Sequence, residues 1–383
     1  MSNFYNTKIQ KYINANLNTD LHSLLLKKSP FSEVSMQELV QQIKGRKISE
    51  KKFPFLNKEN VIFPPNLNLE QASSQDTAEY KAQFFKGKKF IDLTCGFGID
   101  AYFLSQNFEE ITLVEQNTEL LEIVKHNWEV LGRKANFINQ KLEDFLKNNV
   151  EKIDLIYLDP ARRDNNNRKV FLLEDLSPNV IEIQEKLGEI SEEILVKLSP
   201  LIDLQHLVSS LKNISKIWII AVKNEVKEVL IHIKKTDEET EISCVNLQSS
   251  EPQFNFTLNN EKNCKSEFSV PEKFIYIPNN SILKSGAFNL VSEKFGLKKL
   301  HQNTHIYTLE KVRENFPGRI FEVEEINPKE IKKGEQFNII TKNFPIKPEE
   351  IKKKYKLKDG GNQYLIGVKS FSGNHFLNGK LIN

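Results

Sequence analysis

The sequence has few cysteines, few arginines and no long apolar run. Its 383 residues include three cysteines, Cys95, Cys244 and Cys264, which lie far apart in the chain. This spacing excludes a disulfide framework and a cysteine-based zinc site. The apolar run Ile217–Val222 is far shorter than the roughly 20 residues of a membrane-spanning helix. The first residues lack the apolar stretch of a signal peptide, so we expect a cytoplasmic protein without a membrane partner.

The histidines give no sign of a metal site. His126, His301 and His305 have no spacing that a bound metal would require, and roles in the core or on the surface are expected for them. Together with the scattered cysteines, they lead us to expect no metal cofactor.

Arginine is scarce in a chain that is otherwise rich in lysine. Lys and Arg number 54 against 51 Asp and Glu, and the net charge of +3 by itself indicates no partner. Seven of the basic residues are arginines, and Arg162, Arg163 and Arg168 fall within one short window. Only arginine offers a planar fork for a phosphate or a base. A solvated surface loop is the alternative, because RRDNNNR is rich in turn-forming Asn and Asp.

The first part of the chain reads as a helical region. Ser35 and Glu38 have the spacing of a capping box, and apolar residues then recur at helical spacing up to Gly45. Ser73 and Asp76 have the same spacing, which predicts a second helix from about 74 to 85.

From residue 88, short apolar runs alternate with helical patterns. The expected strands are KKFIDLTC, ITLVEQ, ANFINQ, KIDLIYLDP, EILVKLSP and KIWIIAV. This alternation predicts an α/β fold with a parallel, Rossmann-like sheet built from right-handed βαβ units. A helix near 224–234 and two strands, EISCVNLQ and PQFNFTL, are expected to close the sheet with an antiparallel edge.

The remaining sequence predicts two small α+β modules. The first contains FIYIPNN, a helix over about 281–295 and THIYTLE, and the second contains RIFEVEEI, FNIITKNF and YLIGVKS around the helix Pro348–Leu357. The lysines of Lys342–Lys358 outnumber its glutamates by seven to two, which indicates a solvated helix face or a surface for RNA. The expected division is an N-terminal helical region over 1–84, a sheet domain over 85–260, and modules over 270–319 and 320–383.

A glycine-containing turn follows the first strand of the sheet. Asp92 ends the strand in DLTCGFG, and Gly96 and Gly98 let the backbone approach a ligand at the start of the next helix. Glu115 ends the second strand, where a carboxylate could accept both hydroxyls of a ribose. Gly96, Gly98 and Ala101 also match the dinucleotide fingerprint, so a dehydrogenase is an alternative at this point.

A second acidic residue ends the fourth strand, beside the ligand crevice of such a sheet. Asp159 and the carbonyl of Pro160 could accept hydrogen bonds from a nucleophilic amino group. Asp92 lies inside the first strand and suits a ligand with an ammonium group better than a pyrophosphate. Lys197 and Ser199, at the end of the fifth strand, face the same crevice and could contact a substrate.

These motifs resemble those of class I S-adenosylmethionine (SAM)-dependent methyltransferases, and more closely those of the bacterial members with a C-terminal THUMP-like domain. The blocks that carry the resemblance run from about residue 60 to the end, and include EQASSQDTAEYKA, YLDPARRD, VKLSPLIDL, KSGAF, NTHIY, FPGR and LKDGG. The resemblance implies a SAM-binding domain, a ferredoxin-like module over 270–319 and a THUMP-like module over 320–383, the last related by name to RNA-binding domains. It implies no particular substrate.

The resemblance also implies roles for single residues. The methionine part of SAM would be held by Asp92, Thr94, Gly96 and Gly98, and its ribose by Glu115. The family has an acid directly after the third strand, where this sequence has Asn139-Gln140-Lys141. Gln140 and Leu142 are therefore our choice for the adenine contact.

The tetrad Asp159-Pro160-Ala161-Arg162 departs from the family's amino-directed enzymes, which carry an aromatic residue after the prolines. An arginine there resembles the tetrad of C5-uridine RNA methyltransferases, but those need a cysteine nucleophile, and the three cysteines here are badly placed for that role. Methyl transfer to a nitrogen needs in-line positioning and a lone pair, and no strong base.

The sequence therefore predicts a SAM-dependent methyltransferase that acts on a base nitrogen in RNA. Asp159, Pro160 and Arg162 are the expected catalytic residues, and the expected substrate contacts are Arg163, Arg168, Lys197 and Ser199. A methyltransferase for a protein or small molecule and a non-catalytic, SAM-binding RNA-binding module are the alternatives.

Overall fold

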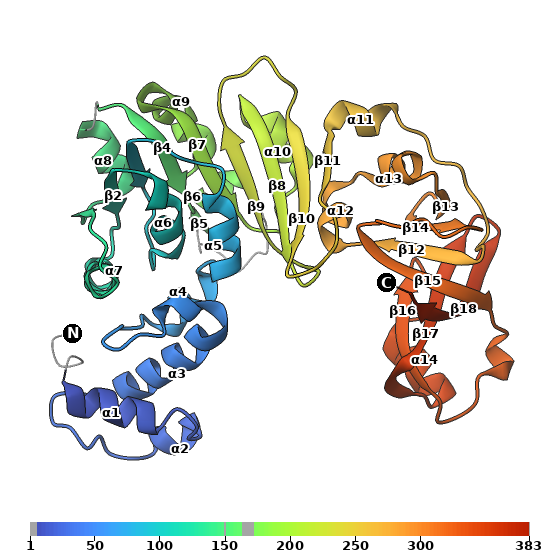
Figure 1. Ribbon diagram of the computed structural model, residues 1–383, viewed down its shortest axis with the longest axis horizontal. Coiled ribbons are helices and arrows are strands. Elements are labelled where there is room, and N and C mark those ends of the chain that lie inside the picture. The colour runs from blue at the N-terminus through green and yellow to red at the C-terminus, as the bar shows by residue number, and fades with distance from the viewer. Residues whose placement is uncertain (1–5, 149–150, 163–171, 383) are drawn as a thin grey trace. The chain divides into compact units, whose positions relative to one another are not determined.

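In the computed structural model, the chain folds into two units (Figure 1). The structure describes residues 6–148, 151–162 and 172–382. Unit 1 comprises Met1–Ile214 and Leu230–Thr236, and unit 2 comprises Ser215–Val229 and Asp237–Asn383.

Unit 1 begins with short helices that form a layer of their own, joined to the sheet through α5 (Figure 1). These helices are α1 (Thr7–Ala15), α2 (Leu21–Leu25), α3 (Met36–Lys52), α4 (Asn66–Gln71) and α5 (Gln75–Ala82). The predicted capping box opens α3, because Glu38 N donates to Ser35 Oγ and Ser35 N donates to the Glu38 carboxylate. The helix continues past Gly45, where we expected it to end. Phe63 packs against that glycine so closely that a Cβ would lie 2.3 Å from its own Cβ.

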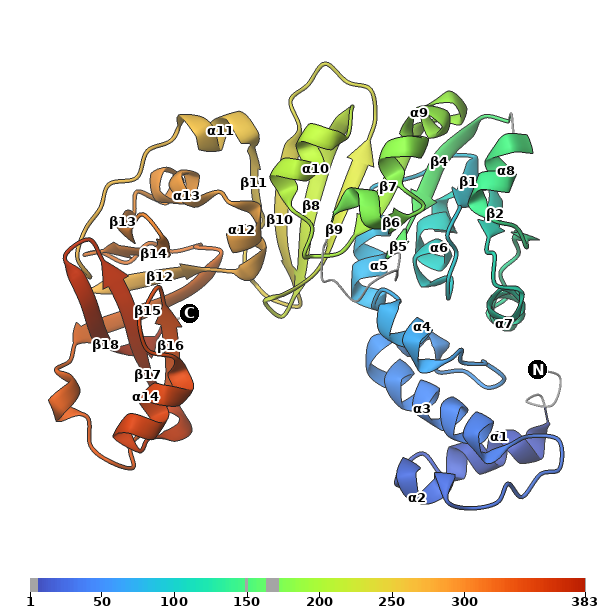
Figure 2. The same ribbon diagram turned by 180° about the vertical axis from the view of Figure 1, so that it is seen from behind.

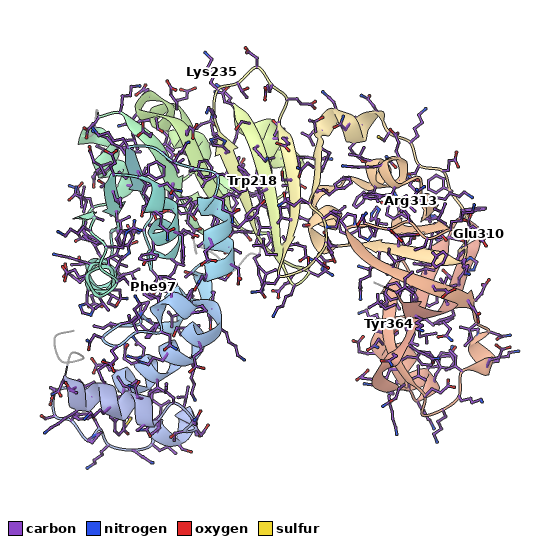
Figure 3. All side chains as sticks on the ribbon, viewed as in Figure 1. Phe97, Trp218, Lys235, Glu310, Arg313 and Tyr364 are labelled. Atoms are coloured by element: carbon purple, nitrogen blue, oxygen red, sulfur yellow. The ribbon has the colours of Figure 1, made fainter. Side chains whose placement is uncertain are left out.

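The helical layer packs on the sheet domain mainly through aromatic rings. Phe53 contacts Phe97 edge to face, and Phe55 stacks on Tyr102 with 4.8 Å between the ring centroids. Phe97 is labelled at this junction in Figure 3. The ring of Phe97, in the turn after the first sheet strand, is therefore buried against the N-terminal helices.

The sheet of unit 1 is parallel, as predicted. Its strands are β1 (Lys89–Asp92), β2 (Glu110–Val114), β3 (Asn136–Ile138), β4 (Ile153–Leu158) and β7 (Ser191–Leu198), in the order β7-β4-β1-β2-β3. The helices between and after them are α6 (Ile99–Leu104), α7 (Thr118–Val130), α8 (Leu142–Asn148), α9 (Val180–Ile190) and α10 (Leu204–Ser210). The order reverses between β1 and β4, and ligands bind beside the carboxyl ends of strands at such a point.

The segment 224–234 is a strand, and the predicted helix is wrong. Lys223 and Asn224 both have left-handed backbone angles, with φ of 49° and 64°. Two such residues form the short turn that joins antiparallel strands. They connect β8 (Ile214–Val222) to β9 (Glu225–Ile233), whose β-branched residues favour an extended chain.

The predicted antiparallel edge is present. β10 (Glu241–Leu247) pairs in parallel with β8, and β11 (Phe254–Thr257) pairs with β10 in the antiparallel sense. Trp218, labelled in Figure 3, lies on β8 opposite Ser243 of β10.

The C-terminal part of unit 2 is built on one seven-stranded sheet (Figure 2). Its strands are β12 (Phe274–Pro278), β13 (Lys298–His301), β14 (Thr304–Leu309), β15 (Gly318–Glu325), β16 (Gln336–Lys342), β17 (Lys358–Ser370) and β18 (Gly373–Leu381), in the order β13-β14-β12-β15-β18-β17-β16. β13 and β18 were not predicted from the sequence. Because β12 pairs with β15, the residues before and after Gly318 share one sheet.

A shared core accompanies this shared sheet. Ile275 and Leu300 from the first half pack in one cluster with Phe321 and Ile366 from the second. Tyr364, labelled in Figure 3, packs against the same cluster. The proposed modules over 270–319 and 320–383 therefore share one hydrogen-bonded sheet and one hydrophobic core.

The helices of this part of unit 2 are α11 (Leu258–Asn263), α12 (Asn280–Ser285), α13 (Phe288–Phe295) and α14 (Pro348–Tyr355). The single helix predicted over 281–295 is divided at Gly286, whose φ of 80° ends α12. Gly296 ends α13 with a φ of 63°, as the sequence indicated. Among the described residues, no helix is long and apolar enough to cross a membrane.

Candidate functional site

The turn after β1 places a buried carboxyl group beside two glycines. Asp92 is 1% exposed, and its Oδ1 accepts a 2.9 Å hydrogen bond from Thr94 N. Gly96 has a φ of 53°, and the nearest neighbour of a Cβ built there would be 3.8 Å away. Gly98, with a φ of 73°, leads into α6. The backbone at Gly96 therefore borders open space.

Glu115 connects this turn to the end of β2. Its Oε2 accepts from Gly96 N at 2.9 Å, and its Oε1 accepts from Asn117 N at 2.8 Å. A carboxylate offers about four lone-pair sites, so further donors can still bind. The structure thus brings together Asp92, Gly96 and Glu115 from two neighbouring strand ends.

Asn139 takes a structural role that the sequence did not reveal. It occupies the position where the family has an acid, and its Nδ2 donates to Glu115 O at 2.9 Å. Its Oδ1 accepts from Thr118 Oγ1 at 2.8 Å. The amide therefore joins the ends of β2 and β3. Gln140 is exposed and Leu142 is buried at the start of α8, and their contact with adenine stays a prediction.

Asp159 is held at the end of β4 by both its backbone and its side chain. Its N donates a 2.6 Å hydrogen bond to Thr94 Oγ1, and its Oδ2 lies 2.5 Å from Lys197 Nζ. About a third of the side chain, 34%, is exposed. Burial raises the pKa of Asp159, and the Lys197 ammonium group opposes this rise. Pro160, which follows, is buried.

A buried network behind Asp159 was missed by the sequence interpretation. Asp100, on α6, lies 2.6 Å from Lys81 Nζ and 3.7 Å from Lys197 Nζ. Ser73 Oγ and Tyr157 Oη each donate to Asp100 Oδ2 at 2.7 Å. Although burial opposes it, the two ammonium groups lower the pKa of Asp100.

Ser73 belongs to this network, and the helix cap expected of it is wrong. The N-cap of α5 is Ser74, whose side chain accepts from Thr77 N. Ser73 is 6% exposed and also accepts from Lys81 Nζ at 3.1 Å. A signal in the sequence was available, because Asp100 interrupts an otherwise apolar helix, IDAYFL.

Asp92 has an environment suited to a cation. Burial raises its pKa well above the usual value, and the nearby carboxyl groups of Asp100, Asp159 and Glu115 add to this effect. A positive ligand group beside Asp92 would favour its charged form. Strongly perturbed carboxyl groups are typical of functional sites.

The other predicted substrate residues are placed as follows. Lys197 is 8% exposed and is paired with Asp159. Ser199 Oγ accepts from Leu201 N at 3.3 Å and so stabilises the turn after β7. Arg163 and Arg168 lie outside the described residues, as does the side chain of Arg162.

The backbone on both sides of residues 163–171 is paired. β5 (Ala161–Arg162) is antiparallel to β6 (Leu176–Ser177). This short ladder begins directly after Asp159 and Pro160.

The three cysteines are buried, which raises the pKa of each thiol. The pKa of Cys244 rises to about 12 and that of Cys264 to about 11. The reactive form of cysteine is the thiolate, and these thiols stay protonated near neutral pH. Covalent cysteine chemistry is thus disfavoured here. Among the described residues, no group of His, Cys, Asp and Glu has the arrangement of a metal site.

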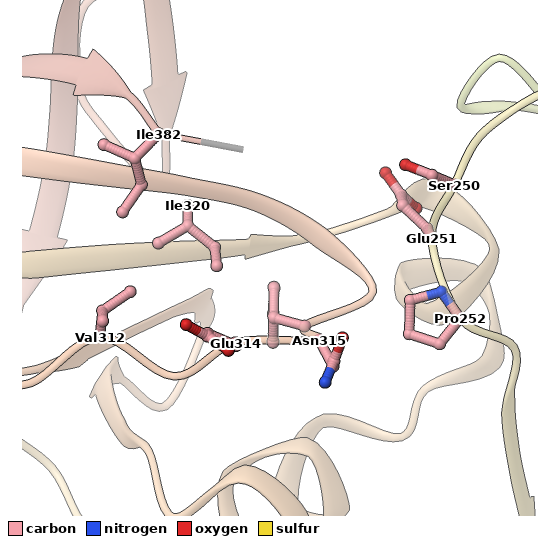
Figure 4. Close-up of a pocket in the computed structure, with 9 residues that line it drawn as sticks. Ser250, Glu251, Pro252, Val312, Glu314, Asn315, Ile320 and Ile382 are labelled. Atoms are coloured by element: carbon pink, nitrogen blue, oxygen red, sulfur yellow. The ribbon is translucent and has the colours of Figure 1, made fainter.

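A cavity lies in unit 2 (Figure 4), whereas the predicted site residues belong to unit 1. Its volume is about 280 Å³, and loops after β10 and β14 contribute Glu251, Glu314 and Asn315 to its lining. The backbone of Arg313, labelled in Figure 3 near Glu310, is held beside it by a 2.7 Å hydrogen bond to Tyr276 Oη.

Comparison with protein families gives three matches along the chain. Residues 72–194 match the family described as Conserved hypothetical protein 95, residues 274–317 a ferredoxin-like domain, and residues 318–376 a THUMP domain-like family. A search of the curated proteins finds no match.

The chain is similar over nearly its whole length to a solved structure from Porphyromonas gingivalis W83, of a protein assigned as a methyltransferase. The two are 28% identical over 98% of each chain, with a TM-score of 0.86. An rRNA methylase from Streptococcus thermophilus is 13% identical over 42% of this chain and 95% of its own, with a TM-score of 0.32.

The first of these structures has the same α/β fold throughout, and the family matches fall on the sheet domain and the two C-terminal modules. The predicted fold and the predicted enzyme class are thereby confirmed. The chain thus shares its fold over 98% of its length with a protein assigned as a methyltransferase, and its residues 318–376 match the THUMP domain-like family.

Proposed function

We propose that the protein transfers a methyl group from SAM to a nitrogen of an RNA base. The observation that carries this proposal is the position of Asp159. Its partly exposed carboxylate is fixed at the end of β4 by Thr94 and Lys197, next to the glycine turn. A fixed acceptor at this place suits an amino group that must point at a methyl donor.

The residues around the turn fit SAM. Asp92 is a buried carboxyl group whose raised pKa would be relieved by the ammonium group of the methionine part. Thr94, Gly96 and Gly98 would line the same part, because the backbone at Gly96 borders open space. Glu115 would accept the ribose hydroxyls, and Gln140 and Leu142 would border the adenine. When bound, SAM supplies an electrophilic methyl group.

The acceptor side would be formed by the end of β4. Asp159 and the Pro160 carbonyl would accept hydrogen bonds from the substrate amino group and turn its lone pair toward the methyl donor. The proton released after transfer would pass to Asp159 and then to solvent, since the carboxylate is partly exposed. Arg162, Arg163 and Arg168 would contact the base or a phosphate, and Ser199 would border the substrate.

An RNA substrate is supported by the C-terminal half of unit 2. Residues 318–376 match the THUMP domain-like family, and α14 carries exposed lysines, among them Lys353 and Lys354. Exposed cations on one face of a module favour binding to a phosphate backbone. The three-arginine window beside Asp159 adds a second cationic region.

The test is methyl transfer with purified protein. The enzyme is incubated with radiolabelled SAM and with total RNA from a strain that lacks the gene, and the modified nucleoside is then identified by mass spectrometry. We expect label in one RNA species, on a base nitrogen. Total RNA from the parent strain should accept little label, because its sites are already methylated.

Two variants make the test specific. Asp159→Ala should reduce transfer at least 100-fold, while Asp144→Ala, which changes an exposed carboxylate on α8, should leave it unchanged. Label that appears in protein or metabolite fractions and never in RNA would refute the proposed substrate class.

A further inference from the structure

We propose that Lys197 is a positioning residue for Asp159, and that a buried chain of charges, Lys81–Asp100–Lys197, holds it in that role. The proposal rests on the proposed function, in which Asp159 receives the substrate amino group. It reassigns Lys197, which the sequence placed among the substrate contacts.

The first step is geometric. Lys197 Nζ lies 2.5 Å from Asp159 Oδ2 and 3.7 Å from Asp100 Oδ2. The ammonium group therefore lies between two carboxylates, one that belongs to the candidate acceptor site and one that is 8% exposed in the protein interior. The two carboxylates hold the lysine ammonium group beside Asp159, so it does not turn toward a substrate.

The second step concerns Asp100, which is a fixed anion. Lys81 contacts its Oδ1, and Ser73 and Tyr157 donate to its Oδ2. The Lys81 side chain is 0% exposed. A buried carboxylate with this many donors stays ionised and keeps its orientation. Asp100 thus gives the Lys197 ammonium group a permanent partner that takes no part in the reaction.

The third step is the balance of charge. Lys81 and Lys197 carry two positive charges, and Asp100 and Asp159 carry two negative charges when Asp159 is ionised. Buried charges are tolerated when they are paired. Protonation of Asp159 leaves one positive charge in excess, so the network favours the ionised acceptor.

The consequence for the reaction is that Asp159 is held as an ionised acceptor in one orientation. Thr94 fixes its backbone and Lys197 engages Oδ2, so that Oδ1 would receive the substrate amino group. The network also ties the acceptor to the start of α5, because Ser73 Oγ accepts from Lys197 Nζ at 3.2 Å.

The sign of the pH dependence follows from the charged groups around Asp159, which are Asp92, Asp100, Lys81 and Lys197. Without Lys197, the two aspartates oppose ionisation of Asp159, and its pKa rises. Without the charge of Asp100, the two lysines favour ionisation, and the pKa of Asp159 falls. The two changes therefore act in opposite directions.

The experiment measures kcat and KM for methyl transfer to RNA from the deletion strain, between pH 5 and 9. In Lys197→Met we expect kcat to fall at least tenfold and the acidic midpoint to rise by about one pH unit. Lys197→Arg should recover most of the activity. In Asp100→Asn the acidic midpoint should fall. If the latter variant does not fold, Asp100→Asn combined with Lys81→Met removes one charge of each sign and should keep the wild-type midpoint.

A second measurement needs no RNA. Carbon-13 NMR of labelled aspartate follows the titration of Asp159 directly, in the wild type and in Lys197→Met. Calorimetry with S-adenosylhomocysteine checks that affinity for the cofactor product changes less than about threefold. An unchanged Asp159 titration in Lys197→Met would overturn the proposal. If the Asp159 titration shifts but no RNA becomes labelled, the positioning role of Lys197 is supported. In that case only the proposed RNA substrate is contradicted.

Discussion

The backbone amide of Asp159 donates a 2.6 Å hydrogen bond to the side-chain oxygen of Thr94. This bond joins the turn after β1 to the end of β4, the two strand ends between which the sheet order reverses. In the proposed enzyme, the first borders the methyl donor and the second borders the acceptor. The Thr94 hydroxyl thus fixes the distance between the turn that borders the methyl donor and the strand end that borders the acceptor.

Thr94→Val should lower both kcat and the free energy of unfolding. The loss of one hydrogen bond to a buried amide costs about 1–3 kcal/mol, whereas loss of alignment slows methyl transfer by at least tenfold. Thr94→Ser keeps the oxygen and is the matched control, with activity near that of the wild type. Equal activity in both variants would show that the bond does not set the alignment. Urea unfolding and kcat report the two effects separately.

Glu115→Gln should weaken binding of S-adenosylhomocysteine by about tenfold, because a neutral amide accepts from ribose hydroxyls less strongly than a carboxylate. The Gly96 and Asn117 amides that Glu115 holds lose the same charge assistance. Calorimetry measures the affinity. Glu119→Gln, an exposed change on α7, is the control and should bind as the wild type does. An unchanged affinity in Glu115→Gln would remove Glu115 from the proposed cofactor site.

Gly98→Ala should destabilise the fold strongly. The φ of 73° is strained for alanine, and the new Cβ would lie 2.8 Å from Val124 Cγ1 on α7. The expected loss in free energy of unfolding is about 2–4 kcal/mol, as the sum of backbone strain and overpacking. Gly132→Ala is the matched control, because it has a φ of 74° and no neighbour within 4 Å. Its loss should be about 1 kcal/mol, from strain alone. If the two variants lose similar free energies of unfolding, α7 must shift to accommodate the added methyl group.

Local patterns were sufficient to predict the parallel sheet and the strand ends around the site. Apolar runs such as that of β4 are typical of strands that are buried on both faces. The segments between successive runs are long enough to form helices. The capping box at Ser35 was equally clear, because both of its bonds lie within one turn. These features depend on neighbouring residues only.

Features that depend on distant residues could not be predicted in this way. The helix expected near 224–234 is a strand, because the left-handed Lys223 and Asn224 form a turn that needs a partner strand. The network around Asp100 joins residues 73 to 197, and the sequence indicated a substrate contact for Lys197 and no role for Lys81. Asn139 was read as a missing acid, although its amide joins two strand ends. In the last two cases the decisive contact links segments that are far apart in the sequence.

Lys81→Met should cost about 3–5 kcal/mol, since it leaves the Asp100 carboxylate buried beside fewer cations. Lys212→Met breaks an exposed pair with Glu185 and should change stability very little. The pKa of Asp100 is lowered in the fold, so its stabilising contribution is present above its unfolded pKa and is lost as the pH falls. The difference between Lys81→Met and the wild type should therefore shrink below about pH 4, the ordinary range of an unfolded aspartate, and urea unfolding at pH 7 and pH 3 measures it. A difference that is the same at both pH values would contradict the pairing.

Lys353→Gln with Lys354→Gln should weaken RNA binding in a manner that depends on salt. Both side chains are exposed on α14, in the module that matches the THUMP domain-like family. Each lost phosphate contact reduces the slope of log Kd against log salt by about 0.7–0.9. Fluorescence anisotropy between 50 and 300 mM KCl measures this slope. Lys8→Gln with Lys11→Gln removes the same charge from α1 and should leave the slope unchanged. Equal slopes in both double variants would assign the lysines of α14 to a solvated helix face, the alternative that the sequence left open.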